Sequence, residues 1–107
     1  MNPLLDQADE FIKLAIKTEK RGFYYLAHTR YTQVWTTLLN LVLLRDSGTI
    51  SLSAQEEGRL ATIYQLLAVR LQGLVAKMRN GAKMSGREQD TPKMAIEVLL
   101  QEVLAGF

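Results

Sequence analysis

The chain has 107 residues, enough for one small domain with a modest hydrophobic core. Its net charge of +2 is too weak a bias to indicate nucleic-acid binding by itself. The absence of cysteine excludes disulfides and thiolate chemistry, and no apolar run approaches the length of a membrane span. We therefore expect a cytoplasmic protein with no membrane span.

The first predicted element is an amphipathic helix, because apolar residues recur every three or four positions over residues 4–16. Pro3 stands where a first helical turn tolerates proline. Acidic residues come early and basic residues late, which complements the helix dipole. Asp9 and Lys13 have the spacing of a surface ion pair. Gly22 then predicts the end of the helix and an immediate start of the next.

The second predicted helix covers about residues 23–46. Its apolar stripe is Tyr24, Ala27, Tyr31, Val34, Trp35, Leu38, Leu41 and Val42. The helical spacing of the three aromatic residues in this stripe favours the core over a base-stacking platform, whereas Tyr25 falls off the stripe and is expected to be exposed. Residues 38–44 are apolar nearly all round, which predicts that other helices or another chain cover this half on two sides.

The third predicted helix follows a turn at residues 46–49 and begins at a capping box formed by Ser53 and Glu56. Residues 80–81 predict its end. Its buried stripe is Leu60, Ile63, Tyr64, Leu67, Leu71, Leu74, Val75 and Met78. Beside that stripe runs a shallow row made of Ala61, Gln65, Ala68 and Gln72. Gly73 costs about 1 kcal/mol inside a helix, which suggests that another backbone approaches closely there.

Residues 82–91 are polar and are predicted to form a flexible linker between a bundle at residues 1–81 and a short helix at residues 92–107. The basic residues around this linker are Lys77, Arg79, Lys83, Arg87 and Lys93. Acidic neighbours dilute them, which favours a solvated hinge over a nucleic-acid patch. The short helix has apolar residues at Ile96, Leu99, Leu100, Val103, Leu104 and Phe107. It is too short to be stable in isolation, so it must dock on another surface.

His28 is the only histidine of the chain, and no Asp or Glu stands three or four residues from it. Metal sites need several ligands, so a structural or surface role is favoured for this side chain. No phosphate-binding glycine loop, paired catalytic carboxylates or Ser/His/Asp set can be assembled from the sequence. The sequence therefore predicts a protein that is not an enzyme and holds no cofactor or metal.

A pattern of small, acidic and aromatic residues spans the first hairpin, at Ala15, Glu19, Gly22, Tyr24, Ala27 and Tyr31. The third helix adds Tyr64, Ala68 and Leu71. Together these residues resemble the MIT (microtubule-interacting and transport) domain, a three-helix bundle found on proteins of the ESCRT pathway. The resemblance covers roughly residues 4–80. A tetratricopeptide hairpin shares part of the pattern, but the second helix here is too long for that unit and no repeat follows.

The resemblance implies a groove between the second and third helices that binds an amphipathic helix of a protein partner. The shallow row Ala61, Gln65, Ala68 and Gln72 would form the floor of this groove, or would let the bundle helices pack closely. Leu67 and Val69 stand where the family often carries charges beside the groove, which puts a typical ESCRT-III tail as the ligand in doubt.

The last helix resembles the helical tail motif that MIT domains bind, through Glu97, Leu100, Leu104 and Phe107. Val103 replaces the usual arginine of that motif. We therefore expect residues 92–107 to occupy a groove, either on their own bundle or on a second copy of the chain.

We expect an all-α fold, with an antiparallel three-helix bundle and a short fourth helix at the C-terminal end. The expected function is a non-catalytic protein-interaction module, an adaptor of the ESCRT or trafficking type. One alternative is a small secretion-type chaperone or self-assembling subunit, a homo-oligomer formed through the second helix and the last helix. Another, less favoured, is a small helical subunit of a nucleic-acid-associated complex.

Overall fold

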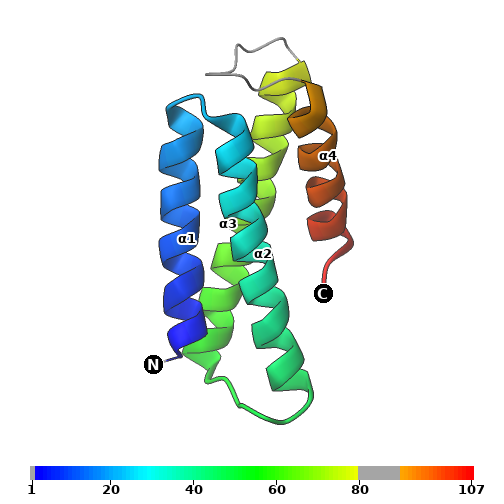
Figure 1. Ribbon diagram of the computed structural model, residues 1–107. Helices are drawn as coiled ribbons and strands as arrows, with labels where there is room; N and C mark the ends of the chain where they lie inside the picture. The colour runs from blue at the N-terminus through cyan, green and yellow to red at the C-terminus, as the bar shows by residue number, and fades with distance from the viewer. Residues whose placement is uncertain (1, 80–89) are drawn as a thin grey trace.

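The computed structural model describes residues 2–79 and 90–107, which form four helices and no strand (Figure 1). The helices are α1 (Pro3–Lys20), α2 (Tyr24–Asp46), α3 (Ala54–Arg79) and α4 (Asp90–Ala105). This arrangement confirms the all-α prediction with a short C-terminal helix. Most of the linker predicted at residues 82–91 lies outside the described residues, and its last two residues belong to α4. No helix in the described ranges has the length and apolarity that crossing a bilayer requires.

The α1–α2 hairpin turns at Gly22, as its position in the sequence predicts. Gly22 has a φ of 83°, a left-handed conformation that glycine adopts without steric cost. Its backbone N–H donates to the Glu19 carbonyl at 2.9 Å, and the N–H of Phe23 donates to the Thr18 carbonyl at 3.4 Å. These bonds satisfy the last carbonyls of α1, so only two residues separate the α1 C-cap, Arg21, from the first residue of α2, Tyr24.

The predicted capping box starts α3. The Ser53 N–H donates to the Glu56 carboxylate at 3.1 Å, and the Glu56 N–H donates to the Ser53 hydroxyl at 3.1 Å. Arg59 of α3 pairs with Asp6 near the start of α1 at 2.9 Å. At the opposite ends of the same two helices, Lys77 pairs with Glu19 at 2.9 Å. The helices α1 and α3 are therefore parallel, and α2 runs antiparallel to both.

Aromatic and aliphatic side chains of all four helices share one core. The aromatic stripe of α2 lies inside it, with Tyr31 fully buried and Trp35 only 4% exposed. Tyr25, which falls off the stripe, is 51% exposed. Both observations confirm the prediction that helical spacing separates core aromatics from surface ones. The ion pair predicted between Asp9 and Lys13 is also present, at 2.8 Å.

The carboxylate of Glu19 is buried, with 1% of the side chain exposed, and it joins three helices. Tyr31 of α2 donates a hydrogen bond to it at 2.5 Å. From α3, Lys77 donates at 2.9 Å and Arg70 lies 3.4 Å away. Burial, reinforced by the hydrogen bond to Glu19, raises the pKa of Tyr31, so the phenol stays a neutral donor. A buried charge is tolerated here because both carboxylate oxygens have partners.

The described helices of this chain do not cover the second half of α2 on two sides, so its predicted cover by another chain stays a prediction. Leu39 is 39% exposed and Leu43 is 67% exposed. Leu38, Leu41 and Val42 face the core. One side of this half therefore presents leucines to solvent.

The close backbone approach suggested at Gly73 is not found in the described structure. A Cβ atom built on Gly73 would meet nothing within 4 Å, so no neighbouring backbone needs the absence of a side chain. The glycine weakens α3 without a packing gain that could offset its entropic cost.

Replacing Gly73 with Ala should raise the free energy of unfolding by about 1 kcal/mol, because alanine restricts the unfolded chain and fits the open space. Thermal unfolding followed by circular dichroism should show a melting temperature about 5 °C higher. Gly48→Ala is the matched control. Gly48 has a φ of 77° and equally open surroundings, so the same change there should destabilise the chain by about 1–2 kcal/mol. Equal effects at the two sites would contradict this account.

Replacing Glu19 with Ala should lower the free energy of unfolding by about 2–4 kcal/mol in urea denaturation. The change leaves the buried Tyr31 hydroxyl without its acceptor, whereas Lys77 and Arg70 are partly exposed and can turn towards water. Asp9→Ala is the control, because it removes the exposed pair with Lys13 and should cost less than about 1 kcal/mol. A loss at Glu19 no larger than in this control would rule out the anchoring role of the network.

Candidate helix-binding site

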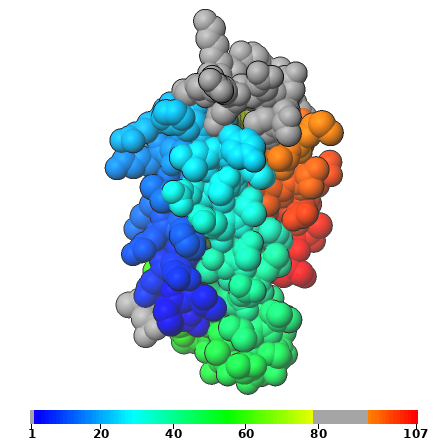
Figure 2. Space-filling model, viewed as in Figure 1, coloured from blue at the N-terminus to red at the C-terminus, as the bar shows by residue number. Residues whose placement is uncertain are grey.

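The helix α4 lies along α2 and α3 and, within the described residues, makes no contact with α1 (Figures 1 and 2). Three side chains on one side of α4 are almost fully buried: Ile96, Leu99 and Val103. The opposite side of the helix is exposed, with Val98 54% accessible. The amphipathic helix α4 thus docks on the bundle of its own chain.

We call the surface that receives α4 the α2–α3 face, and define it by His28, Thr32 and Trp35 of α2 and Tyr64 of α3. His28 lies beside Ala95, near the start of both helices. Trp35, two turns further along α2, contacts the C-terminal end of α4 through Phe107. The helix α4 is therefore parallel to α2 and antiparallel to α3.

A left-handed glycine ends α4 and turns the next residue onto the bundle. Gly106 has a φ of 86° and donates its N–H to the Val103 carbonyl at 3.1 Å. The Tyr64 hydroxyl donates to the same carbonyl at 2.5 Å. Both bonds satisfy a carbonyl that the helix leaves open at its C-terminus, and the second links α4 directly to α3.

Three aromatic rings form a cluster where α4 ends: Trp35 of α2, Tyr64 of α3 and Phe107, which follows α4. The Phe107 ring stacks on Trp35 with centroids 5.3 Å apart and an interplanar angle of 20°. It is tilted against Tyr64 at 5.1 Å, and Tyr64 lies 6.1 Å from Trp35. Offset and tilted ring pairs of this kind stabilise beyond their buried area. The side chain of Phe107 nevertheless remains 54% exposed, so one side of the cluster faces solvent.

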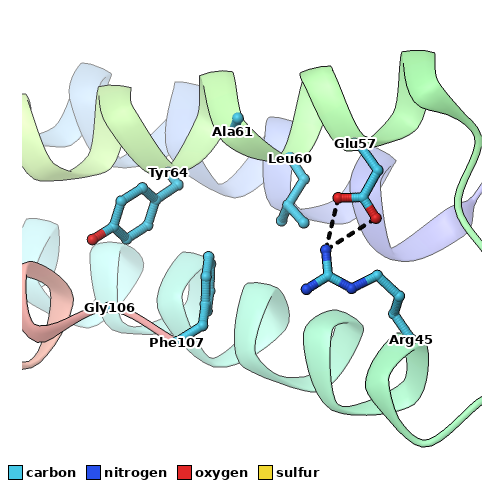
Figure 3. A pocket seen from close by; sticks show the side chains of 7 residues that line it. All are labelled: Arg45, Glu57, Leu60, Ala61, Tyr64, Gly106 and Phe107. Carbon is cyan, nitrogen blue, oxygen red and sulfur yellow. Dashed lines mark hydrogen bonds and ion pairs between the residues drawn. The ribbon is translucent and has the colours of Figure 1, made fainter.

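A pocket of about 340 Å³ opens directly beyond this cluster, between α2 and α3 (Figure 3). Its lining consists of Arg45, Glu57, Leu60, Ala61, Tyr64, Gly106 and Phe107. Arg45 and Glu57 bind each other through two hydrogen bonds of 3.0 and 2.7 Å at one end of the pocket. The pocket therefore continues the α2–α3 face past the end of α4 and combines apolar walls with one ion pair.

The other end of the α2–α4 contact holds His28, in a second pocket of about 340 Å³ lined also by Thr32, Val98 and Glu102. Burial lowers the pKa of His28, and a hydrogen bond with the backbone of Ala95 partly opposes this effect. The ring lies at a helix–helix contact and is half-buried. This placement agrees with the prediction of a structural role for the only histidine.

The shallow row predicted as a groove floor does not lie together beneath α4. Ala68 is half-buried and packs against the core. Ala61 is exposed but lines the pocket beyond α4. Gln65 and Gln72 are exposed. Ala61 alone of the four lines the pocket, Ala68 packs against the core, and the two glutamines face solvent.

The three residues predicted to dock the last helix also have different environments. Leu100 is half-buried against the core, and Phe107 joins the ring cluster. Leu104 is 53% exposed. The residues that docking buries most completely are Ile96, Leu99 and Val103, none of which was predicted as a docking residue. Their spacing of three and four residues was the available signal.

The site can bind a ligand through apolar side chains, through the stacked aromatic rings and through the Arg45–Glu57 ion pair. Within the described residues, no group of three or more His, Asp or Glu side chains could hold a metal ion. This arrangement can bind an apolar or amphipathic segment. The charges of Arg45 and Glu57 already neutralise each other in their ion pair. Comparison of the chain with protein-family models, curated proteins and solved structures gives no match.

We expect the single histidine signal in an NMR titration to have a midpoint below the ordinary value of 6.5, because α4 desolvates the ring. The unfolded chain then takes up the proton first, so the free energy of unfolding should fall as the pH drops from about 6.5 through the folded pKa. Val103→Asp should unseat α4 and return the midpoint towards the ordinary value. A midpoint that the variant does not move would show that α4 is not what buries His28.

Proposed function

We propose that this chain is a non-catalytic protein-interaction module that binds an amphipathic helix on its α2–α3 face. The supporting observation is the position of α4. It is itself an amphipathic helix, and it lies on this face with Ile96, Leu99 and Val103 buried and the opposite side in solvent. A helix laid on an apolar surface formed by two other helices is an established mode of peptide recognition.

The MIT-like pattern of the hairpin supports the same proposal, because that resemblance implies binding between the second and third helices. The finer form of the proposal is an adaptor of the ESCRT or trafficking type. The partner would present a helix with apolar residues three and four positions apart, as α4 does at its buried side.

We propose further that the partner helix competes with α4. Three described side chains of α4 are buried, whereas α2 buries nine residues, so α4 is less firmly anchored than α2. The pocket beyond Phe107 is the part of the face that α4 leaves open. A partner would therefore make its first contact at Leu60, Tyr64 and Phe107 before it takes the place of α4.

A second candidate function is self-assembly through α2. Leu39 and Leu43 present an apolar surface that none of the described residues covers. A stable dimer in light scattering would favour this candidate, because exposed leucines on one helix are typical of a contact between copies.

A labelled peptide of residues 90–107 tests the proposed module as a stand-in for a partner helix. Fluorescence anisotropy should show at least tenfold tighter binding to the Val103→Asp chain than to the unchanged chain, because the tethered α4 competes at a high effective concentration. Val98→Asp is the matched control, since it makes the same substitution at a position that is 54% exposed, and it should bind like the unchanged chain. The proposal would fail if the Val103→Asp chain kept its helical circular dichroism but did not bind the peptide.

A further inference from the structure

The outer side of α3 is exposed and carries no charge. We call it the α3 outer face and define it by six exposed residues: Gly58, Thr62, Gln65, Leu66, Val69 and Gly73. Leu66 is 38% exposed and Val69 61%, so large apolar side chains face solvent near its centre. In the described stretch from Ala54 to Ala76, every exposed residue of α3 is uncharged, whereas α1 exposes lysines and a glutamate. A helix face that only meets water is ordinarily charged and polar.

The charged residues of the same stretch lie to the sides of the α3 outer face. All of them are half-buried, and each has a partner within the chain. Glu56 closes the capping box with Ser53, Glu57 pairs with Arg45, Arg59 with Asp6, and Arg70 with Glu19. Another helix can therefore cover the α3 outer face without burying an unpaired charge, which is the most costly group to enclose in an interface.

Two glycines of the α3 outer face have no explanation within the chain. Gly58 and Gly73 both lie inside α3, and neither adopts a left-handed conformation. A Cβ atom built on either would meet nothing within 4 Å. Glycine weakens a helix interior, so the described contacts of the chain give no reason for either residue. The close approach of a backbone from outside the chain would give one.

The α3 outer face has similar side-chain shapes in both directions from its midpoint, which lies between Gln65 and Leu66. These two side chains are of similar length. Further out, Thr62 and Val69 have the same branched shape and stand equally far from the midpoint, and beyond them Gly58 and Gly73 are identical. The midpoint also lies near the middle of α3. Such a face is complementary to a second copy of itself in the antiparallel direction, as an isologous dimer requires.

We propose that the α3 outer face is the interface of a homodimer, in which α3 packs antiparallel against α3 of a second copy. The two-fold axis passes between residues 65 and 66. Thr62 of each copy then lies opposite Val69 of the other, and Gly58 lies opposite Gly73, so the backbones approach closely on both sides of the axis. A second copy is the occupant that suits an uncharged face, because a two-fold axis brings identical residues together and like charges would repel.

The dimer contact lies on a different side of α3 from the helix-binding site. Tyr64 is turned towards α4, where its hydroxyl binds the Val103 carbonyl, and it is not part of the α3 outer face. The proposal therefore does not depend on the helix-binding function. Gly58 and Gly73 are about 22 Å apart along the helix, at 1.5 Å per residue. One helix pair of this length is a small interface, so we expect a dissociation constant of about 10–100 µM.

Sedimentation equilibrium of the full chain tests the dimer. Between about 5 and 500 µM, the mass should rise from 12.1 kDa towards twice this value. Val69→Lys should weaken the dimer at least tenfold, because each copy then places an ammonium in the contact. Leu43→Lys makes a similar change at a position of α2 that is 67% exposed, and should leave the dimer unchanged. A chain that stays monomeric overturns the proposal. A dimer that Leu43→Lys breaks and Val69→Lys does not would assign the contact to α2 and also overturn it.

Disulfide cross-linking tests the antiparallel direction. The chain has no cysteine, so introduced thiols are the only ones present. A mixture of Thr62→Cys and Val69→Cys chains should form a cross-linked dimer on oxidation, whereas either variant alone should not. Equivalent positions are seven residues apart in this arrangement, about 10 Å along the helix, which is too far for a disulfide. Faster cross-linking of Thr62→Cys with itself would indicate parallel helices and overturn the proposal.

The two glycines offer a readout that a role within one chain would not produce. Gly73→Ala should weaken the dimer about tenfold, because the added methyl group overpacks the contact. At a concentration where the chain is monomeric, the same variant should still raise the melting temperature. Gly58→Ala should weaken the dimer similarly, because the two-fold axis places the two glycines against each other. A dimer that neither variant weakens would contradict the close approach and overturn the proposed interface.

Discussion

The buried carboxylate of Glu19 is the constraint on which the rest of the bundle depends. The left-handed turn at Gly22 brings Tyr31 of α2 back against this carboxylate, and Lys77 approaches it from α3. A charge removed from water must keep its partners, so these helices cannot slide or rotate independently at this end.

The Glu19 network fixes how α1, α2 and α3 lie against one another. One side of α2 and α3 stays free of α1, and α4 covers this side. The contact of α4 with α2 and α3 has a polar group at each end. The half-buried His28 lies at one end, and the hydrogen bond from the Tyr64 hydroxyl to the Val103 carbonyl lies at the other. Between them it is apolar, with few side chains fully buried, and the proposal that a helix of similar pattern replaces α4 rests on this character.

Several features that the sequence did not reveal have one cause: the pattern of a helix does not show what lies opposite it. The open space around Gly73 depends on how far α3 is from its neighbours, not on the residues of α3. The exposure of Leu39 and Leu43 arises because α4 ends near Trp35 and covers no more of α2. The pairing of Glu19 with Lys77 joins residues 58 positions apart, and no local spacing predicts such a contact.

The sequence alone determined the presence of the four helices, the turn at Gly22, the Ser53–Glu56 capping box and most of the core stripes of the first three helices, because these follow from local periodicity and from single turn and cap residues. It did not determine the rotation of α4. Two apolar stripes share that helix, one through Ile96 and Val103 and the other through Leu100 and Leu104, and both have helical spacing. The tertiary structure decided between them, because the α2–α3 face buries the first stripe fully and leaves Leu104 in solvent.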